Sequence, residues 1–529
     1  MTLHRNARLL ALVGLAALLA PTSRAFARAE APRGQAQPPV VTAEEAARMV
    51  GRNVYFAVGS AMPTSILRPI RLFAQQREGR TNAFYMSTFA SAVNFGREVS
   101  EKFHPNLFFV SMSNREAATG GWATLHRDSL GALAKRINQG EFGIDTVVVR
   151  ATPPDANGYV SFGPTSDLTM PAINAALRAG GKVIAEINPN MPRTRGDNKL
   201  HISQLSAVVE GNEVLAELTQ MAPTVSEQAI AKNIGRLVPN NRRSTLQVGI
   251  GGSLVAIGEA MKNKRLRIWS EMGSDWVVDV MGRPKHKVSE AVFSFLLGTN
   301  NLYTLANNNE RLRMESMLTV NDPAVIARQK RMVAVNTALE VDLAGNINAE
   351  RIDGRIISFP GGQPNFMEGA SRAPDGKAIL GLRSINKYGE STIVTALHGP
   401  VTTPANHLDY LATEWGATRR LRGLNAAQRT YELISVAHPA HRKAMADAAL
   451  TAGTLTQKQR DKLVRSVPHA IRLAAPQLAR MGADLSLARG AITQAEYAQL
   501  TANLPPAENH GEGGMPLPPP PPPLPPANP

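Results

Sequence analysis

Apolar segments of strand length alternate with helix-like segments over most of the 529-residue chain. The first series starts at Thr42, a predicted helix N-cap with Glu45 at the capping-box position. Its strand-like segments are 53–59, 106–112, 144–151 and 182–189, with a helical stretch at 170–180. Strand, helix and strand in this order predict a parallel sheet that is covered by helices.

The same alternation restarts after a polar stretch that contains Pro223 and Pro239. The second series of apolar segments is 246–252, 254–262, 266–271, 331–343, 355–362 and 377–384. The sequence therefore predicts an α/β protein with two similar α/β domains, at residues 42–222 and 238–438. Residues 439–504 are alanine-rich with helical periodicity, which predicts a C-terminal helical extension.

Both ends of the chain have compositions that predict no packed fold. Residues 1–27 have the three-part pattern of a secretory signal peptide: early positive charges, an apolar run and a small-residue cleavage site. Residues 28–41 are predicted to be a disordered lead, and residues 505–529 a disordered or polyproline II tail. A functional signal would make the protein periplasmic or secreted. A start codon assigned too far upstream would leave it cytoplasmic.

Composition excludes several classes of chemistry. The chain has no cysteine, which rules out disulfides, thiolate metal sites and cysteine nucleophiles. Its net charge of +16 would suit nucleic acid, a membrane surface or a phosphate-bearing ligand. Nucleic acid is disfavoured, because no basic run has interleaved aromatic residues. The N-terminal apolar run is too short for a membrane span. A phosphate-bearing ligand, or a plain solvated basic surface, explains the charge better.

Glu271 follows the apolar segment 266–269, where an ionised carboxylate would be costly to bury. It could neighbour a helix cap, form an ion pair or act as a nucleophile. Glycine turns follow two other strand-like segments, at 249–252 and 361–362. One turn could hold a phosphate or pantetheine arm, and the other could donate amides to a developing oxyanion. Such an assembly suits acyl transfer.

A nicotinamide-binding site is a weaker alternative for the same region. The first turn begins as a dinucleotide fingerprint, and Glu271 lies about where a ribose-binding acid would be expected. Leu254, however, stands where that fingerprint requires its third glycine. The turn alone is therefore not specific.

Eight segments follow one another along the chain: NPNMPRTRGD, LQVGIGG, SEMGSD, VNDPAVIA, ALEVDLAGNINAE, FPGGQPNF, VTTP with TEWG, and VAHPAHR. Together they resemble the acetyl-CoA hydrolase/CoA-transferase family, the group that contains acetate and 4-hydroxybutyrate CoA-transferases. The similarity runs from about Thr42 to Arg442. It implies two similar α/β domains with the active site between them.

The resemblance also implies roles for particular residues. Glu271 matches the nucleophile, Asn321 the residue that orients the acyl group or the glutamate, and Gly362 the amide donor to the thioester oxygen. Glu414 matches a secondary active-site carboxylate. Coenzyme A, a co-substrate and not a permanently bound cofactor, is expected to contact Gly249, Ile250, Gly251, Gly252, Ser253, Gly361, Gly362 and Lys377. No metal is expected.

We therefore expect an acyl-CoA:carboxylate CoA-transferase or acyl-CoA hydrolase that works through a glutamyl-CoA thioester on Glu271. A carboxylate with a pKa of about 4.3 is ionised at neutral pH and needs no general base. The expected partners are acyl-CoA, a small carboxylic acid and a second copy of the chain in a homodimer. The alternative is an exported, catalytically weak protein that binds ligands or partners on the same scaffold.

The chain departs from the family pattern near the nucleophile and near the second glycine turn. Gly273 stands in place of a bulky residue and Trp276 in place of a glycine, so Trp276 is expected to narrow the acyl pocket. Asn365 and Glu368 replace an acidic and a basic residue, and Glu368 is expected to reverse a charge near the cofactor loop.

Three further polar residues receive structural interpretations. Asp275 is expected to cap the helix that follows it. His438 and His441 are three residues apart, which suits one helix face. Because no third ligand accompanies the two histidines, a structural role is favoured over a metal site.

Overall fold

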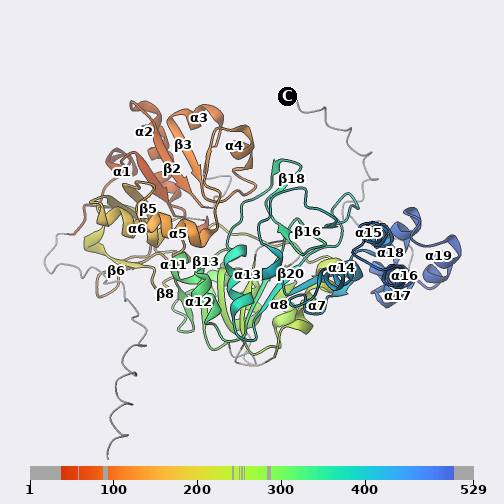
Figure 1. The fold of residues 1–529 in the computed structure, drawn as a ribbon. Coiled ribbons are helices and arrows are strands. Elements are labelled where there is room, and N and C mark those ends of the chain that lie inside the picture. Colours follow the sequence, from red (N-terminus) through yellow and green to blue (C-terminus); the bar gives the residue numbers. More distant parts are fainter. Residues whose placement is uncertain are drawn as a thin grey trace, which may run out of the picture. The chain divides into compact units, whose positions relative to one another are not determined.

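The computed structural model describes residues 37–57, 59–86, 93, 95–240, 244–249, 251, 254, 256–282 and 288–504. The predicted signal peptide and the proline-rich tail lie outside these residues, as do residues 28–36 of the predicted lead. The described residues from Pro38 onward belong to one compact unit. This unit is built on two large sheets (Figure 1).

The first sheet has seven strands, each parallel to its neighbours, in the order β10-β7-β5-β1-β2-β3-β4. The strands are β1 (Asn53–Phe56), β2 (Thr81–Tyr85), β3 (Phe103–Leu107), β4 (Thr124–Leu125), β5 (Thr146–Ala151), β7 (Lys182–Ile187) and β10 (Ala207–Glu210). Every residue of β5 is buried. This explains its continuous apolar run, since both faces of a central parallel strand are covered.

Helices cover both faces of this sheet. One apolar core includes residues from α1 (Ala43–Met49), α2 (Thr64–Gln76), α3 (Arg97–Lys102) and α4 (Arg115–Gly120). The other includes residues from α5 (Leu130–Asn138) and α6 (Thr169–Arg178). Met272 and Phe295 of the second sheet also belong to this second core. The two halves of the chain therefore share a hydrophobic interior.

The second sheet has nine strands in the order β23-β22-β20-β15-β11-β12-β13-β14-β8. All pairs are parallel except β22 with β23. The strands are β8 (Arg195–Gly196), β11 (Thr245–Val248), β12 (Arg267–Gly273), β13 (Ala291–Leu296), β14 (Leu312–Met314), β15 (Met332–Asn336), β20 (Lys377–Gly381), β22 (Tyr410–Thr413) and β23 (Gly416–Ala417).

Strand β8 comes from the first half of the chain yet pairs with β14 of the second half. Gly196 makes this pairing possible, because a Cβ at that position would overlap the Met314 carbonyl. Smaller elements connect the main ones. They are β6 (Tyr159–Ser161), β9 (Lys199–His201), β16 (Glu340–Asp342), β17 (Ile347–Asn348), β18 (Arg351–Ile352), β19 (Arg355–Ile356), β21 (Ile393–Val394), η1 (Gly59–Ala61), η2 (Ile202–Gln204) and η4 (Ala405–His407).

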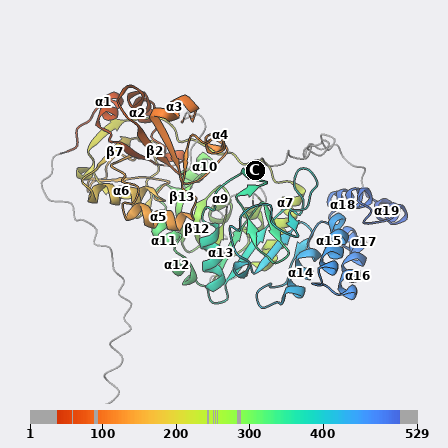
Figure 2. The ribbon, with the colours of Figure 1, turned by 45° about the horizontal axis from the view of Figure 1, so that its top comes forward.

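The second sheet is also covered on both faces. One core contains residues of α7 (Val225–Leu237), α8 (Ile257–Met261), α9 (Trp276–Met281) and α10 (Asn300–Ala306). The other contains residues of α11 (Met317–Val320), α12 (Pro323–Ala327), α13 (Gln363–Arg372) and α14 (Ala426–Ser435). Helix α11 lies beside α5 of the first half, as two views show (Figure 1, Figure 2).

The two sheets repeat one topology. In each, the first strand of the domain lies between the domain's second strand and a strand that comes later in the chain, so β1 lies between β2 and β5, and β11 between β12 and β15. The strand order therefore reverses at β1 in the first sheet and at β11 in the second. This repetition confirms the prediction of two similar α/β domains. The carboxyl ends of the strands at such a reversal form the usual ligand crevice of this architecture.

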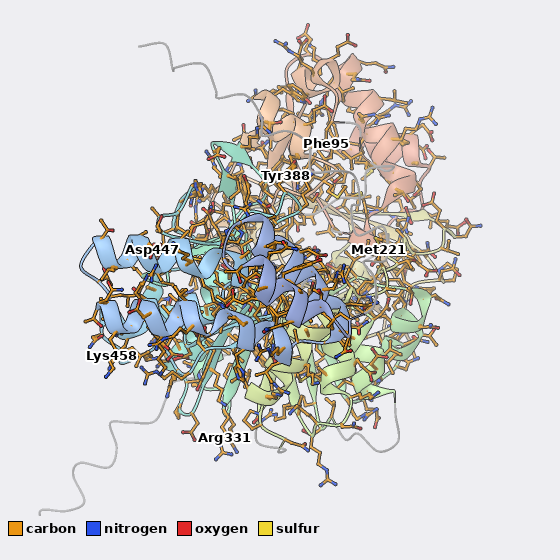
Figure 3. The ribbon with its side chains drawn as sticks, turned by 90° about the vertical axis from the view of Figure 1, so that its right-hand side faces the viewer. Phe95, Met221, Arg331, Tyr388, Asp447 and Lys458 are labelled. Carbon is orange, nitrogen blue, oxygen red and sulfur yellow. The ribbon has the colours of Figure 1, made fainter. Side chains whose placement is uncertain are left out.

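Among the described residues, the segment 439–504 forms five helices and confirms the predicted helical extension: α15 (Pro439–Thr451), α16 (Gln457–Arg465), α17 (Val467–Leu473), α18 (Pro476–Ala488) and α19 (Gln494–Thr501). Figure 3 looks onto this extension, with Asp447 on α15 and Lys458 on α16 labelled. Helices α17 to α19 share a small apolar core, against which Trp415 of the second domain packs. Among the described residues, no helix is both long and apolar enough to cross a bilayer.

Candidate active site

A cavity of about 230 Å³ lies at the carboxyl ends of β11, β12 and β15, where the strand order of the second sheet reverses. Gly249 follows β11, Glu271 lies on β12 and Asn336 ends β15, and all three line the cavity. The second glycine turn, at residues 359–362, forms another wall. Phe109 of the first domain also lines it. The cavity therefore has walls from both domains.

Glu271 lies within β12 and not at its end, because the strand continues to Gly273. Alternate residues of a strand share one face, so Trp269 and Glu271 point to the same side. Both contact the end of α11. Trp269 Nε1 donates to the Val320 carbonyl over 3.0 Å, and Asn321 Nδ2 donates to Glu271 Oε2 over 2.5 Å. The end of α11 thus fixes the orientation of the Glu271 carboxylate.

Asn321 is completely buried at the C-cap of α11. Gly131, in the first turn of α5, leaves room for its backbone, since a Cβ there would lie 2.6 Å from the Asn321 carbonyl oxygen. The side-chain oxygen Oδ1 of Asn321 is buried and has no hydrogen-bond partner among the described residues. The nitrogen end of the amide therefore binds Glu271, and the oxygen end is buried without a hydrogen-bond partner among the described residues.

Gly362 faces the carboxylate directly. A Cβ at this position would overlap Glu271 Oε2 and would lie 2.6 Å from Asn321 Nδ2. Gly362 is also the N-cap of α13. The first amides of a helix have no partner within the helix, and this end carries the positive end of the helix dipole. The N-terminus of α13, with its positive potential, therefore lies beside the Glu271 carboxylate.

The first domain holds this turn in place. The Leu130 amide donates to the Gly361 carbonyl over 2.9 Å. Asn365 Oδ1 accepts from the Gly131 amide over 3.1 Å, and Asn365 Nδ2 donates to Ser129 Oγ over 3.2 Å. Gly361 has φ +62°, a left-handed conformation that favours glycine. Asn365, one of the departures from the family pattern, thus binds the start of α5.

The first glycine turn is partly described. A Cβ at Gly249 would lie 2.6 Å from Asn336 Oδ1, and one at Gly251 would overlap the Thr337 methyl group. Gly251 has φ +145°. The two glycines therefore let this turn approach the end of β15 closely. Ile250, Gly252 and Ser253 lie outside the described residues.

Burial raises the pKa of Glu271 to about 7, although the hydrogen bond from Asn321 lowers it. The nearby charge of Asp167 raises this pKa further. The side chain remains partly exposed, and it lines the cavity. At neutral pH the carboxyl group is thus divided between its two protonation states. The pKa of an exposed side chain, on which the sequence-based expectation rested, is therefore too low for this buried position.

Asp167 is the residue near the nucleophile that the sequence did not reveal. It is fully buried just before α6 and accepts from Thr169 N over 2.8 Å, Thr169 Oγ1 over 3.0 Å and Tyr55 Oη over 3.4 Å. The Thr165 hydroxyl also donates to it. Burial raises the pKa of Asp167. Asp167 belongs to the first domain, and a Thr-Ser-Asp run before a helix is typical of a plain capping segment.

The structure does not bring Lys377 or Glu414 to this cavity. Lys377 begins β20, at the amino-end edge of the sheet, where Nζ donates to the Leu237 carbonyl over 2.7 Å. Glu414 follows β22 and accepts from the amide and hydroxyl of Ser384 over 3.0 and 2.5 Å. Glu414 lines a different cavity, beside the helical extension. Lys377 follows the second glycine turn in the sequence and Glu414 lies in the TEWG segment, but neither side chain reaches the Glu271 cavity.

Trp276 does not line the cavity, so the expectation that it narrows an acyl pocket is wrong. Its ring is buried in the core of the second domain and meets Phe293 edge to face, with centroids 6.4 Å apart. Gly273 lies against Phe293 and Leu296, where a Cβ would come within 3 Å of both side chains. This departure from the family pattern therefore lies in the core, and not in the substrate site.

Glu368 points away from the cavity to the surface of α13, where it pairs with Arg372 over 2.7 Å. Asp275 occupies the N-cap position of α9, but its side chain makes no cap bond there. It accepts instead from the amide and hydroxyl of Thr299, each over 3.0 Å, ahead of α10. The prediction that the Asp275 side chain caps α9 was therefore wrong, and the expected effect of Glu368 on the cofactor loop stays a prediction.

The described residues contain no group of three side chains that could hold a metal ion. His438 caps α15 through Nδ1, which accepts from the Ala440 amide over 3.2 Å. Its ring packs edge to face on Trp415 with centroids 5.1 Å apart. The structural interpretation of His438 is therefore confirmed.

Two repeated α/β domains, a buried carboxylate at a strand-order reversal and glycine turns around it define a CoA-transferase-type enzyme. Comparison with family models gives the assignment. Residues 28–219 match the acetyl-CoA hydrolase/transferase N-terminal domain, and residues 298–449 match the C-terminal domain. The chain belongs to the acetyl-CoA hydrolase/transferase family. Glu271 and the first glycine turn lie between the two matched ranges.

Individual relatives agree with this assignment. The chain is 35% identical to a 4-hydroxybutyrate coenzyme A transferase of Clostridium kluyveri, over 65% of this chain and 81% of that protein. It is 30% identical to a succinyl-CoA:acetate/propanoyl-CoA:succinate CoA transferase of Fasciola hepatica, over 75% and 84%. An acetyl-CoA hydrolase of Saccharomyces cerevisiae is 25% identical over 58% and 65%. The protein is therefore an enzyme of the CoA-transferase and acetyl-CoA hydrolase kind.

Solved structures show the same fold. RipA from Yersinia pestis superposes with a TM-score of 0.72 at 26% identity, over 79% of this chain and 98% of that one. A 4-hydroxybutyrate CoA-transferase from Porphyromonas gingivalis gives a TM-score of 0.65 at 29% identity, over 78% and 98%. None of these comparisons supports the alternatives of a catalytically weak binding protein or a nicotinamide-linked oxidoreductase.

Proposed function

We propose that the protein is an acyl-CoA:carboxylate CoA-transferase that works through a glutamyl-CoA thioester on Glu271, and that it hydrolyses acyl-CoA when water replaces the acceptor acid. The contact between Glu271 and Asn321, opposite Gly362, carries this proposal. It places an oriented carboxylate, an amide donor and a helix N-terminus around one point.

The first half-reaction transfers CoA to the enzyme. Asn321 binds Oε2 of Glu271, so Oε1 is the oxygen that attacks the thioester carbon. A C–O bond forms and the C–S bond breaks, which gives an acyl-glutamyl anhydride and CoA thiolate. The thiolate then attacks the glutamyl carbonyl, and the anhydride C–O bond breaks. The products are a glutamyl-CoA thioester and the free acid as its carboxylate.

The second half-reaction runs these steps in reverse with another acid. Its carboxylate attacks the glutamyl thioester, which gives a new anhydride and CoA thiolate. The thiolate attacks the acyl carbonyl, and the Glu271 carboxylate leaves. The complete cycle neither consumes nor releases a proton. If water attacks the glutamyl thioester instead, the products are the Glu271 carboxyl group and CoA, and the net reaction is hydrolysis.

Each attack passes through a tetrahedral oxyanion. Asn321 Nδ2 already donates to Glu271, and the amides of Gly362 and Gln363 at the start of α13 lie on the side of the carboxylate that Gly362 faces. A preorganised donor of this kind contributes about 3 kcal/mol to transition-state stabilisation. The raised pKa of Glu271 makes its carboxylate a stronger nucleophile than an exposed glutamate, at the cost of a smaller ionised fraction near pH 7.

The substrates follow from the size of the site and from the relatives. A cavity of about 230 Å³ suits a short acyl chain. The names of the relatives reported above refer to acetyl, propanoyl, succinyl and 4-hydroxybutyrate groups. We propose a small aliphatic acid as acceptor, CoA as co-substrate without a permanently bound cofactor, and a homodimeric enzyme.

Trapping of the intermediate tests the proposal. The full-length enzyme is mixed with acetyl-CoA without an acceptor acid, and borohydride is added. Reduction of a glutamyl thioester converts the Glu271 carboxyl group to an alcohol, so the tryptic peptide loses one oxygen and gains two hydrogens. The Glu271→Gln variant is the control and should give an unmodified peptide. An unmodified peptide from the active wild-type enzyme would exclude the covalent route.

A further inference from the structure

A second cavity, of about 380 Å³, lies where the helical extension meets the second domain. Its walls come from α7, the β22–β23 turn and α14 on one side, and from α15, α16 and α17 on the other. It shares no lining residue with the Glu271 cavity. Both family-model matches end at or before residue 449. The part of the wall that α16 and α17 supply therefore lies outside the matched family domains.

A buried cation lines this cavity. Arg442 on α15 is 3% exposed. Its Nε donates to the Ala437 carbonyl over 2.9 Å, and its Nη1 donates to Ser466 Oγ over 3.3 Å. Among the described residues, no carboxylate lies within ion-pair distance of its guanidinium group. A buried charge normally requires a counter-charge, so this cavity contains a positive charge without a partner.

The other charged groups of the cavity leave that charge unbalanced. Arg236 and His469 are exposed and line the same cavity. Glu414 also lines it, but its carboxyl group accepts from the amide and hydroxyl of Ser384. Burial raises the pKa of Glu414, although its hydrogen bonds with Ser384 lower it. Arg442 therefore remains the principal buried charge that a ligand could neutralise.

Part of the wall is apolar and part is polar. Trp415, Leu463, Ala470 and Leu473 line it, and Leu473 is 73% exposed. A ligand that fits these surroundings needs an anionic head for the guanidinium fork and an apolar body for the side chains around it. A carboxylate meets the first requirement with one charge. Inorganic phosphate lacks the apolar body.

We propose that this cavity is a second ligand site, which binds a small organic acid through an ion pair between its carboxylate and Arg442. The bound acid contacts the second domain and the helical extension at the same time. Because it binds only the folded arrangement, it stabilises the docking of the extension by mass action. The site is separate from the chemistry at Glu271 and does not depend on the proposed reaction.

The test uses the full-length protein with hexanoate as probe, and with hexanol and inorganic phosphate as comparison ligands. Binding is measured by isothermal titration and by the shift in thermal unfolding temperature. We expect hexanoate to bind and to raise this temperature, and hexanol to do neither. Arg442→Gln should weaken hexanoate binding by about tenfold or more, as expected for loss of a hydrogen-bonded ion pair.

Two further variants separate this site from other causes. Ala470→Trp fills the cavity but keeps Arg442, and it should abolish binding at this site while CoA transfer stays unchanged. Glu271→Gln should retain the Arg442-dependent binding. The proposal is overturned if Arg442→Gln or Ala470→Trp, whichever folds, binds hexanoate as the wild type does. Absence of hexanoate binding, or Arg442-dependent binding of phosphate alone, would also overturn it.

Discussion

The side-chain amide of Asn321 lies 2.5 Å from Oε2 of Glu271, and this contact joins the end of α11 to the middle of β12. Asn321 therefore orients the carboxylate and also lowers its pKa, whereas burial and the charge of Asp167 raise that pKa. Because the α11 end also packs on α5 of the first domain, the position of the nucleophile depends on residues from both halves of the chain.

Replacement of Asn321 tests this double role. Asn321→Ala removes the hydrogen bond that lowers the Glu271 pKa, so the acid limb of the kcat/KM profile should move to higher pH. At pH 7 we expect a loss of about 10 to 100-fold, since a hydrogen bond to a charged group contributes about 1.5–3 kcal/mol. Part of the loss should be recovered at pH 9. A pH profile that keeps the wild-type limb would contradict the role in ionisation.

The wild-type pH profile should itself show the raised pKa of Glu271. Below pH 7, kcat/KM for acyl-CoA should fall by about tenfold per pH unit, and above pH 8 it should be flat. Asp167→Asn removes a charge that raises this pKa, so it should shift the limb to lower pH with little change on the plateau. If kcat/KM of the wild type fell only below pH 5, the burial of the nucleophile would be contradicted.

The same raised pKa predicts that the nucleophile destabilises the fold. The Glu271 pKa is about 7 in the folded protein against an unperturbed 4.5, so the folded state favours the protonated form. The corresponding stability is present below pH 4.5 and is lost as pH rises through 7. The difference is roughly 3 kcal/mol. Glu271→Gln should therefore unfold at a higher temperature than the wild type at pH 8.

At pH 5 that difference should largely disappear, because the wild-type carboxyl group is then mostly protonated. Thermal unfolding of both proteins at pH 5 and pH 8 supplies the measurement. An equal effect of the substitution at both pH values would mean that packing, and not charge, is responsible.

Gly362 should tolerate no side chain. Gly362→Ala places a Cβ on the position of Glu271 Oε2, so the carboxylate must move. A displacement of about 1 Å costs roughly 100-fold in rate, and we expect kcat to fall by at least that factor. Gly235→Ala on α7 is the matched control, because its Cβ would have its nearest neighbour at 3.5 Å. Equal activity of the two variants would mean that the turn lies elsewhere.

The N-terminal segment gives a prediction about processing. The family match begins at residue 28, directly after the predicted signal peptide at 1–27. If the signal is cleaved, Edman sequencing of protein recovered from the periplasm or the medium should begin at residue 28. An intact N-terminus on cytoplasmic protein would contradict export. Activity of the protein truncated before residue 28 separates this question from catalysis.

The sequence predicted those features that depend on local patterns. Apolar alternation indicated both α/β domains, and the family resemblance singled out Glu271, Asn321 and Gly362, which the structure brings together. Gly249 and Gly361 also line the same cavity. Each of these residues lies in a short motif at a strand or helix end, where position along the chain largely determines position in space.

The remaining features depend on contacts between distant segments, which one sequence does not encode locally. Asp167 comes near Glu271 from the other domain, and Asn365 binds the start of α5. Lys377 is the first residue of β20, so it lies at the amino ends of the strands, whereas the cavity lies at their carboxyl ends. A shift of a few residues along a strand is enough to move a side chain from one end to the other. The pKa of Glu271 could not be predicted either, because it depends on burial by both domains.

The first half of the chain supplies strand β8 to the sheet of the second half, and Arg127 forms a two-bond ion pair with the buried Glu350 over 2.5 and 2.9 Å. These interactions do not require the polar connection at 211–224 to be intact. A protease cut in that connection would accordingly leave two fragments that copurify as a nicked complex. Separate production of either fragment would expose an unpaired sheet edge and half of an apolar interior, which favours aggregation.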